Sequence, residues 1–214
     1  MKKAIFFDLD GTLIDSAPDL ADALNHTLET LNLPTYPLDT IRTWIGGGAS
    51  ILVKRGLSGS KEVEDINKEL FQKALKIFME YYGKNLTHKT SLYPYAKEIL
   101  ETLNKNYDLA LITNKPFAFI EPLLNHFELH HFSLVLGGDS LPQKKPSAMP
   151  LVFALEKFGI KSNEALMVGD SASDYLAAKE TKVPVVLVKY GYDQEIDAFN
   201  VPKIASLKDL MELV

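Results

Sequence analysis

Short apolar runs that alternate with segments of helical spacing constrain this chain more than any other feature. The first run, Ile5-Phe6-Phe7, suits a buried parallel strand and ends at Asp8. Four similar runs follow in the second half of the chain. This alternation predicts an α/β fold, with a Rossmann-like parallel sheet covered by helices on both faces. The expected strands are residues 3–8, 109–113, 134–136, 165–168 and 185–188 (the last), and the expected helices beyond Pro94 are 96–104, 117–126, 149–158, 171–179 and 206–213.

Residues 15–82 show no strand signal and predict a helical insertion. Ser16-Ala17-Pro18-Asp19 has the features of a helix start, with a capping Ser, an early Pro and an acid three residues after the Ser. Gly46–Gly48 predicts a turn or a helix start, and residues 61–82 carry the spacing of one long amphipathic helix. We therefore expect an α/β core of residues 1–14 and 83–214, and an inserted helical cap of residues 15–82.

The composition excludes several classes of function. Hydrophobic residues make up 46% of the chain and charged residues 24%, as in ordinary globular proteins. A net charge of -5 argues against nucleic-acid binding, and zero cysteines exclude disulfides and thiolate catalysis. The apolar run near the N-terminus is too short for a signal peptide, and no stretch is long enough to cross a bilayer. We expect a cytoplasmic protein, monomeric or homodimeric, that binds a small phosphorylated metabolite and neither nucleic acid nor membrane.

Polar side chains stand where three of the predicted strands end. Asp8-Leu9-Asp10 ends the first strand, Thr113-Asn114-Lys115 ends the second, and Asp170 follows a later one, with Asp174 one turn on. Any one of them is also a common cap or turn residue, but capping does not explain why all lie at strand ends. In an open parallel sheet, ligands bind outside the carboxyl ends of the strands. The sequence therefore predicts a site at this edge, with Lys145 supplied by a neighbouring loop.

Asp8 and Asp10 are two residues apart, so in an extended chain their side chains point the same way. Two carboxylates side by side repel each other, and burying them unpaired is costly. A divalent cation removes this cost. Oxygen ligands without Cys or clustered His favour Mg²⁺ over zinc, and Asp170 is the natural third ligand.

The same pair of carboxylates suits phosphoryl transfer through an aspartyl-phosphate, in which one carboxylate attacks phosphorus and the other moves protons. Like unit charges about 4 Å apart repel by about 4 kcal/mol at an effective dielectric constant near 20, and a phosphate carries nearly two charges. A metal and a lysine must offset this repulsion, and Lys145 is the best candidate for the lysine. Thr113, Asn114 and nearby backbone amides are predicted to bind the phosphate oxygens.

These residues resemble the motifs of the haloacid dehalogenase-like phosphatases. Asp8-Leu9-Asp10-Gly11-Thr12-Leu13 is similar to the first motif, and Thr113, Lys145 and the run from Gly169 to Asp174 are similar to the second, third and fourth. The resemblance implies that Asp8 is the nucleophile and Asp10 the general acid and base. It implies Mg²⁺ on Asp8, the carbonyl of Asp10 and Asp170, with Asp174 in support. Haloacid dehalogenases lack the second aspartate, so Asp10 favours phosphate esters as substrates.

Further runs resemble one branch of this family, the bacterial phosphoglycolate phosphatases. The resemblance implies 2-phosphoglycolate as the substrate and a cap that closes over it, which excludes water until the aspartyl-phosphate forms. Tyr95 and Lys182 depart from the pattern because the family usually has Gly there, and Ser147-Ala148-Met149 departs from its usual Asp-Pro-Ala. The runs that carry the resemblance are Asp15–Leu20, Trp44–Ala49, Thr113–Pro116 and Gly137–Asp139.

A two-carbon phosphorylated acid also needs a partner for its carboxylate. Solvated surface roles are equally consistent with the charged candidates. Other functions stay open: a capped phosphatase acting on pyrophosphate or sugar phosphates, a phosphomutase resembling β-phosphoglucomutase, or a non-catalytic binding protein. The intact set Asp8, Asp10, Lys145 and Asp170 argues against the last of these. The candidates for the carboxylate are Arg42, Lys54, Arg55, Lys115 and the backbone amides of Gly46, Gly47 and Gly48.

Overall fold

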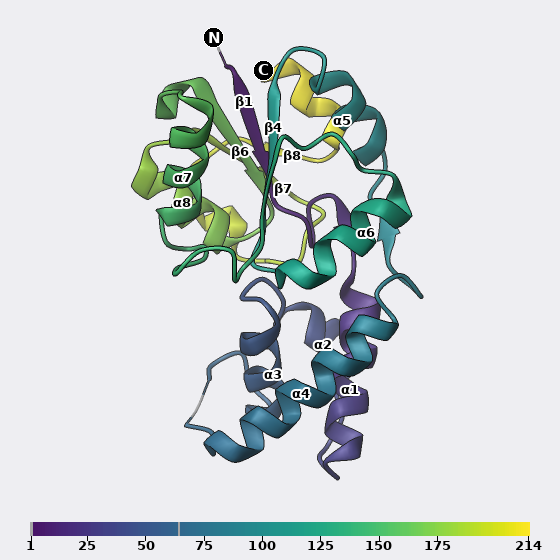
Figure 1. The fold of residues 1–214 in the computed structure, drawn as a ribbon. Coiled ribbons are helices and arrows are strands. Elements are labelled where there is room, and N and C mark those ends of the chain that lie inside the picture. Colours follow the sequence, from purple (N-terminus) through teal and green to yellow (C-terminus); the bar gives the residue numbers. More distant parts are fainter. Residues whose placement is uncertain (1, 64) are drawn as a thin grey trace.

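A computed structural model describes residues 2–63 and 65–214 of the chain (Figure 1). Six strands form one parallel sheet in the order β5-β4-β1-β6-β7-β8, so β1 lies inside the sheet between β4 and β6. The predicted parallel α/β sheet is confirmed. The strands are β1 (Ala4–Phe7), β4 (Asp108–Ile112), β5 (Leu134–Leu136), β6 (Ala165–Gly169), β7 (Val185–Val188) and β8 (Lys203–Ile204).

Successive side chains of β1 pack into two different hydrophobic clusters, one on each face of the sheet. Ile5 and Phe7 belong to the cluster formed with α5 and α6, whereas Ala4 and Phe6 belong to the cluster formed with α7 and α8. This is the two-residue period of a strand covered on both faces, and all four side chains are 0% exposed. The predicted helices on both faces are confirmed: α5 (Ala96–Leu103), α6 (Ile120–Phe127), α7 (Met149–Phe158) and α8 (Ala172–Thr181).

Four further helices lie together beyond the end of the sheet at which β1 ends (Figure 1). We call them the cap helices. Their apolar faces pack on one another through buried side chains such as Leu24, Leu52 and Phe78. Among the described residues, no helix is long and apolar enough to cross a membrane. The cap helices are α1 (Ala17–Thr30), α2 (Leu38–Arg42), α3 (Ala49–Ser58) and α4 (Lys68–Lys84).

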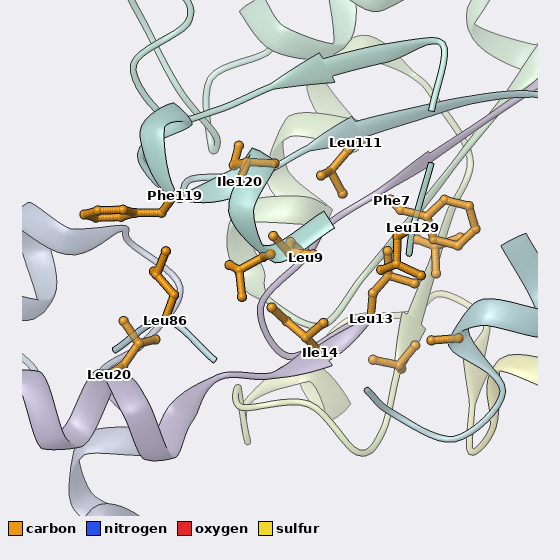
Figure 2. Close-up of a cluster of buried hydrophobic side chains, with 14 of the residues drawn as sticks. Phe7, Leu9, Leu13, Ile14, Leu20, Leu86, Leu111, Phe119, Ile120 and Leu129 are labelled. Atoms are coloured by element: carbon orange, nitrogen blue, oxygen red, sulfur yellow. The ribbon is translucent and has the colours of Figure 1, made fainter. Parts of the chain in front are cut away.

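The hydrophobic core continues from the sheet into the cap helices. Figure 2 shows Leu9, Leu13 and Ile14 between Phe7 of β1 and Leu20 of α1. Leu9, Leu13 and Ile14 are each fully buried. Because apolar side chains anchor this segment along its length, the polar residues between them have little freedom to move.

The long helix predicted over residues 61–82 begins later, at Lys68. The side chain of Asn67 accepts hydrogen bonds from the backbone N–H groups of Glu69 and Leu70, which caps the helix there. Val63 fits the apolar spacing but is 41% exposed, so no core contact extends the helix toward it. Glu64, which the prediction also included, lies outside the described residues.

The start of α1 also differs from the prediction. Ser16 precedes the helix but makes no side-chain cap, because its hydroxyl donates to Asp10 instead. Asp19 is 1% exposed and accepts hydrogen bonds from the backbone N–H groups of Lys89 and Thr90. Asp19, which was expected to take part in capping α1, therefore binds the segment of Lys89 and Thr90 to this helix instead.

Four short elements were not predicted correctly. Ile14–Asp15 (β2) pairs antiparallel with Ser91–Leu92 (β3), so the statement that residues 15–82 contain no strand is wrong for Asp15. β8 follows β7, so 185–188 is not the last strand. The closing helix is a 3₁₀ helix over Leu207–Glu212, with Leu207 and Leu210 buried one turn apart. The three strands β2, β3 and β8 have two residues each, too few to show a period, which is why the sequence did not reveal them.

Two positions at which the sequence lacks an expected Gly adopt left-handed backbone conformations. Tyr95 has a φ of 69° before α5, and Lys182 has a φ of 57° at the C-terminus of α8. A residue with a Cβ pays an energetic cost in this region that Gly does not pay. Tyr95 and Lys182 therefore adopt the backbone conformation that glycine favours, although each has a side chain.

Lys182→Gly should stabilise the protein by about 1 kcal/mol, because it removes the cost of the left-handed conformation at the end of α8. Glu180→Gly is the matched control, since Glu180 is an exposed residue within α8, where Gly should cost about 1 kcal/mol. Urea denaturation of both variants measures the two changes. A destabilised Lys182→Gly variant would contradict the prediction.

Candidate active site

The carboxyl ends of four parallel strands bring the predicted polar residues to one edge of the sheet. Asp8 directly follows β1, Thr113 follows β4 and Asp170 follows β6. The loop after β7 adds Tyr192, whose backbone N–H donates to Asp170 Oδ2 at 2.7 Å. Residues far apart in the chain thus meet because all these strands run in the same direction.

Three buried carboxylates form the centre of this edge. Oxygen atoms of Asp8, Asp170 and Asp174 lie within 4.8 Å of one another, and each residue is at most 7% exposed. Lys145 Nζ lies 3.0 Å from Asp8 Oδ1 and donates to Asp174 Oδ1 at 2.6 Å. One buried cation therefore faces three buried acids, which leaves a surplus of negative charge.

This surplus of negative charge changes the titration of the acids. Burial raises the pKa of Asp8 to about 6, and the neighbouring Asp174 and Asp10 add to the effect while Lys145 opposes it. Burial, together with Asp8 and Asp174, also raises the pKa of Asp170 well above its ordinary value. Burial alone would lower the pKa of Lys145, but Asp174 and Asp8 raise it instead, so Lys145 stays charged.

The donor set fits a hard divalent cation such as Mg²⁺. Asp8 Oδ1 is buried, and its ion pair with Lys145 Nζ at 3.0 Å is its one close polar contact among the described residues. Asp174 is less free, because its Oδ2 accepts hydrogen bonds from Asp170 N, Ser171 N and Ser171 Oγ, and its Oδ1 from Lys145. Asp8 and Asp170 are therefore the better ligands, and Asp174 holds the turn that carries Asp170.

Asp10 lies beside this cluster, and its carboxylate faces a different set of partners. Asp10 Oδ1 accepts hydrogen bonds from Ser16 Oγ at 2.5 Å and from Lys115 Nζ at 2.9 Å. Gly11 follows with a φ of 86°, and a Cβ there would lie 2.1 Å from Asp170 Oδ2. Only a glycine lets the chain turn this close to Asp170.

Thr113 and Asn114, two of the predicted phosphate-binding residues, have different surroundings in the structure. Thr113 is 3% exposed at the end of β4, with its hydroxyl accepting from Lys115 N at 3.2 Å. Asn114 Nδ2 donates to Gly46 O at 3.0 Å and to Lys145 O at 2.9 Å. A side-chain amide has two donor hydrogens, so both are in use. In this arrangement Asn114 links the cap to the loop of Lys145.

The glycine loop before α3, residues Gly46–Gly48, packs directly against the loops at the sheet edge. Lys144 Nζ donates to Gly47 O at 2.8 Å. A Cβ on Gly48, where φ is 80°, would lie 2.4 Å from the carbonyl oxygen of Asn114. Gly46 and Gly48 line the cavity described below, whereas Gly47 does not.

A small cavity of about 30 Å³ lies between the sheet edge and the cap helices. Asp8, Asp10, Thr113 and Lys115 line it from the sheet edge. Lys115 was predicted as a substrate contact or a solvated residue, and at 3% exposed it is not solvated. The cap residues that line the cavity are Leu20, Ile45, Gly46, Gly48, Ala49, Leu52 and Tyr82.

Other candidates for the substrate carboxylate lie outside this cavity. Arg42 makes a bidentate ion pair with Asp15, at 2.9 and 3.1 Å, and its guanidinium lies over the ring of Tyr192. Lys54 Nζ lies over the ring of Phe71, and Arg55 donates to backbone carbonyls. The prediction of Arg42 as a substrate contact finds no support in this geometry, because Asp15 already satisfies its charge.

Two tyrosines at the site were not predicted from the sequence. The hydroxyl of Tyr82 in α4 accepts a hydrogen bond from Lys115 Nζ at 2.6 Å, and the helical spacing gave no sign of this contact. The Tyr192 hydroxyl accepts hydrogen bonds from Ser16 N at 2.8 Å and Ala17 N at 3.1 Å. Tyr192 thus connects the Asp170 loop to the segment that enters the cap, and no local pattern marks it.

The fold and the site define a class of protein: an α/β enzyme with an aspartate-rich site at the carboxyl edge of a parallel sheet, beneath inserted helices. The family model of the haloacid dehalogenase-like hydrolases matches residues 5–188. The chain belongs to this family. The predicted family membership is thereby confirmed, and with it a phosphatase-type hydrolase.

Several relatives match the chain along its length. A phosphoglycolate phosphatase of Psychrobacter arcticus is 42% identical over 217 residues, which cover 100% of this chain and 94% of that protein. A phosphoglycolate phosphatase of Pasteurella multocida is 43% identical over 97% of this chain and 92% of that protein. A crystal structure of a predicted phosphoglycolate phosphatase from Haemophilus somnus 129PT has a TM-score of 0.89 at 37% identity and covers 99% of this chain and 97% of that one.

Asp170→Asn should stabilise the metal-free protein at pH 7.5 and abolish its stabilisation by Mg²⁺. The raised pKa values mean that the folded protein binds protons more tightly than the unfolded chain at Asp8 and Asp170. For Asp8, this stabilisation is complete below pH about 4 and is lost as the pH rises through about 6. A neutral Asn removes one of the repelling charges and should therefore raise Tm. For a chain of this size, each kcal/mol added to the free energy of unfolding raises Tm by roughly 2–4 °C.

Thermal melts with and without Mg²⁺ measure both effects, and the exposed Asp197→Asn serves as the control. A metal response that survives in Asp170→Asn would contradict the assignment of Asp170 as a ligand.

Tyr192→Phe should destabilise the protein by about 1–3 kcal/mol, because the N–H groups of Ser16 and Ala17 lose the buried hydroxyl they share. Tyr107→Phe is the control, since the Tyr107 hydroxyl has no hydrogen bond to a described residue. Urea denaturation compares the two variants. Equal losses of stability in the two variants would show that the hydrogen bonds of the Tyr192 hydroxyl do not stabilise the fold.

Proposed function

We propose that this protein hydrolyses 2-phosphoglycolate to glycolate and phosphate, through an aspartyl-phosphate on Asp8. The observation that carries the proposal is the cavity that Asp8 and Asp10 line together, with a lysine paired to each carboxylate. Relatives named phosphoglycolate phosphatase, 42–43% identical along nearly the whole chain, support the choice of substrate. We also propose that the enzyme acts in the cytoplasm on this small metabolite.

Mg²⁺ would be held by Asp8, Asp170 and the backbone carbonyl of Asp10. When bound, it supplies positive charge that neutralises the acids and the phosphoryl oxygens. Lys145 Nζ, 3.0 Å from Asp8 Oδ1, keeps this carboxylate ionised and lowers its repulsion from phosphate. Thr113 is placed to hold a phosphate oxygen at the same strand end.

The reaction proceeds in two displacements. A carboxylate oxygen of Asp8 attacks phosphorus, and the bond from phosphorus to the ester oxygen breaks. Asp10 donates a proton to this leaving oxygen, so that glycolate departs as an alcohol. Asp10 then accepts a proton from a water molecule that attacks the phosphorus, and cleavage of the phosphorus bond to Asp8 releases inorganic phosphate.

The cap helices control access to this chemistry. The cavity of about 30 Å³ is small and lies beneath the cap residues Leu20, Leu52 and Tyr82. Movement of the cap helices away from the sheet edge would widen it for substrate entry. We propose that residues 15–82 act as a cap that opens for substrate and closes during phosphoryl transfer, so that bulk water stays out until Asp8 carries the phosphoryl group.

Purified protein with Mg²⁺ should release phosphate fastest from 2-phosphoglycolate in a panel with pyrophosphate, β-glucose 1-phosphate and a nucleotide. Asp8→Asn should lower this release by about 10³-fold or more, because the amide cannot form the phosphoenzyme. A chelator should have a similar effect.

Each outcome of this panel bears on a different part of the proposal. Isomerisation of the sugar phosphate without release of free phosphate would indicate a phosphomutase. Faster hydrolysis of another ester would overturn the assignment of 2-phosphoglycolate as the substrate. Full activity of Asp8→Asn would overturn the mechanism. The exposed Asp197→Asn controls for loss of a carboxylate elsewhere.

A further inference from the structure

Lys115 is a buried cation inside the cavity, which is an unusual position for a lysine. It is 3% exposed, and burying an ammonium is costly unless partners compensate for the lost water. Among the described residues that line the cavity, Lys115 is the only one with a cationic side chain. The cavity otherwise has an apolar wall of cap residues such as Leu20 and Leu52.

Two partners hold the ammonium of Lys115, one from each side of the cavity. Lys115 Nζ donates to Asp10 Oδ1 at 2.9 Å and to the hydroxyl of Tyr82 at 2.6 Å. Nζ also lies 4.7 Å from the centre of the Tyr82 ring. Tyr82 packs edge-on against Phe119 and stacks with Phe78, which fixes its position in α4.

The surroundings keep Lys115 protonated. Burial alone would lower its pKa, but Asp10 and Tyr82 raise it above the ordinary value for lysine. Burial raises the pKa of Tyr82 to about 12, so its hydroxyl stays neutral at physiological pH. Lys115 is therefore a permanent positive charge at the wall of the cavity.

The nearby cations, Lys115 included, all have partners, but of these cations Lys115 is the one that lines the cavity. Lys145 is held by Asp8 and Asp174, on the side of the site where the phosphoryl group is transferred. Arg42 is paired with Asp15, and Lys144 donates to Gly47 O. Lys115 is the cation whose position suits the other end of the substrate.

The chemistry of the leaving group places a substrate carboxylate next to Lys115. In the proposed function, Asp10 protonates the ester oxygen, so Asp10 lies within hydrogen-bond distance of that oxygen during the reaction. In 2-phosphoglycolate a single CH₂ group separates the ester oxygen from the carboxylate. A cation hydrogen-bonded to Asp10 is therefore within reach of this carboxylate. Lys115 Nζ donates to both oxygens of Asp10, at 2.9 and 3.2 Å, and to Tyr82, so it would bind the substrate by exchanging its longer contact with Asp10 Oδ2 for the substrate carboxylate.

We propose that Lys115, positioned by the hydroxyl of Tyr82, binds the substrate carboxylate and selects small phosphate esters with a carboxylate one carbon from the ester oxygen. This inference rests on the proposed function. It assigns specificity jointly to the sheet edge, through Lys115, and to the cap, through Tyr82. Closure of the cap would then be coupled to recognition, because α4 carries the residue that holds the lysine.

Comparison of 2-phosphoglycolate with ethyl phosphate tests the proposal, because the two esters differ in the carboxylate alone. The wild-type protein should have a higher kcat/KM for 2-phosphoglycolate. Lys115→Met should lower this preference by about 10–100-fold, the value of a hydrogen-bonded charge pair. Tyr82→Phe should lower it about 3–10-fold, mainly through KM for 2-phosphoglycolate. Lys105→Met, at an exposed lysine, should leave the preference unchanged.

The outcomes separate this inference from the proposed function. If Lys115→Met slows both esters equally and keeps the preference, Lys115 serves only Asp10 and the inference fails while the phosphatase stands. A wild-type protein that hydrolyses both esters equally also overturns it. If the wild-type protein hydrolyses neither, the proposed function fails as well. Should Lys115→Met not fold, as judged by its thermal melt, the result with Tyr82→Phe decides between these outcomes.

Discussion

The close approach of three buried carboxylates is the interaction on which the rest of this structure depends. Lys145 makes ion pairs with Asp8 and Asp174, and Asp170 lies beside these two acids, so part of the negative charge is left uncompensated. Hydrophobic packing offsets this cost, because the strands behind the acids are buried on both faces. This electrostatic cost is concentrated where the proposed metal would be bound, and a divalent cation there would offset it.

The loops that hold this charge also hold the connection to the cap. Tyr192 donates its N–H to Asp170 and accepts hydrogen bonds through its hydroxyl from Ser16 and Ala17. Ser16 in turn donates to Asp10. The residues around the metal site and the first turn of the cap helices therefore form one hydrogen-bonded network.

The cap contributes to the site through contacts that a sheet alone lacks. Tyr82 reaches Lys115 from α4, and Gly46 and Gly47 accept hydrogen bonds from Asn114 and Lys144. The loop lies so close to the sheet edge that Gly48 has no room for a Cβ. In this arrangement the candidate catalytic residues of the sheet edge and the cap residues line one cavity together.

Much of this protein followed from the sequence by itself. The apolar runs predicted β1 and four other strands because burial on both faces is a local property of composition, and parallel strands bring Asp8, Asp10, Thr113 and Asp170 to one edge. The tertiary structure decided which side chains contact one another at the site. Arg42 is paired with Asp15, both donors of Asn114 are in use, and Tyr82 reaches Lys115 across the cavity. These contacts join segments whose distance depends on how the cap helices pack against the sheet, and no local period or propensity encodes that distance.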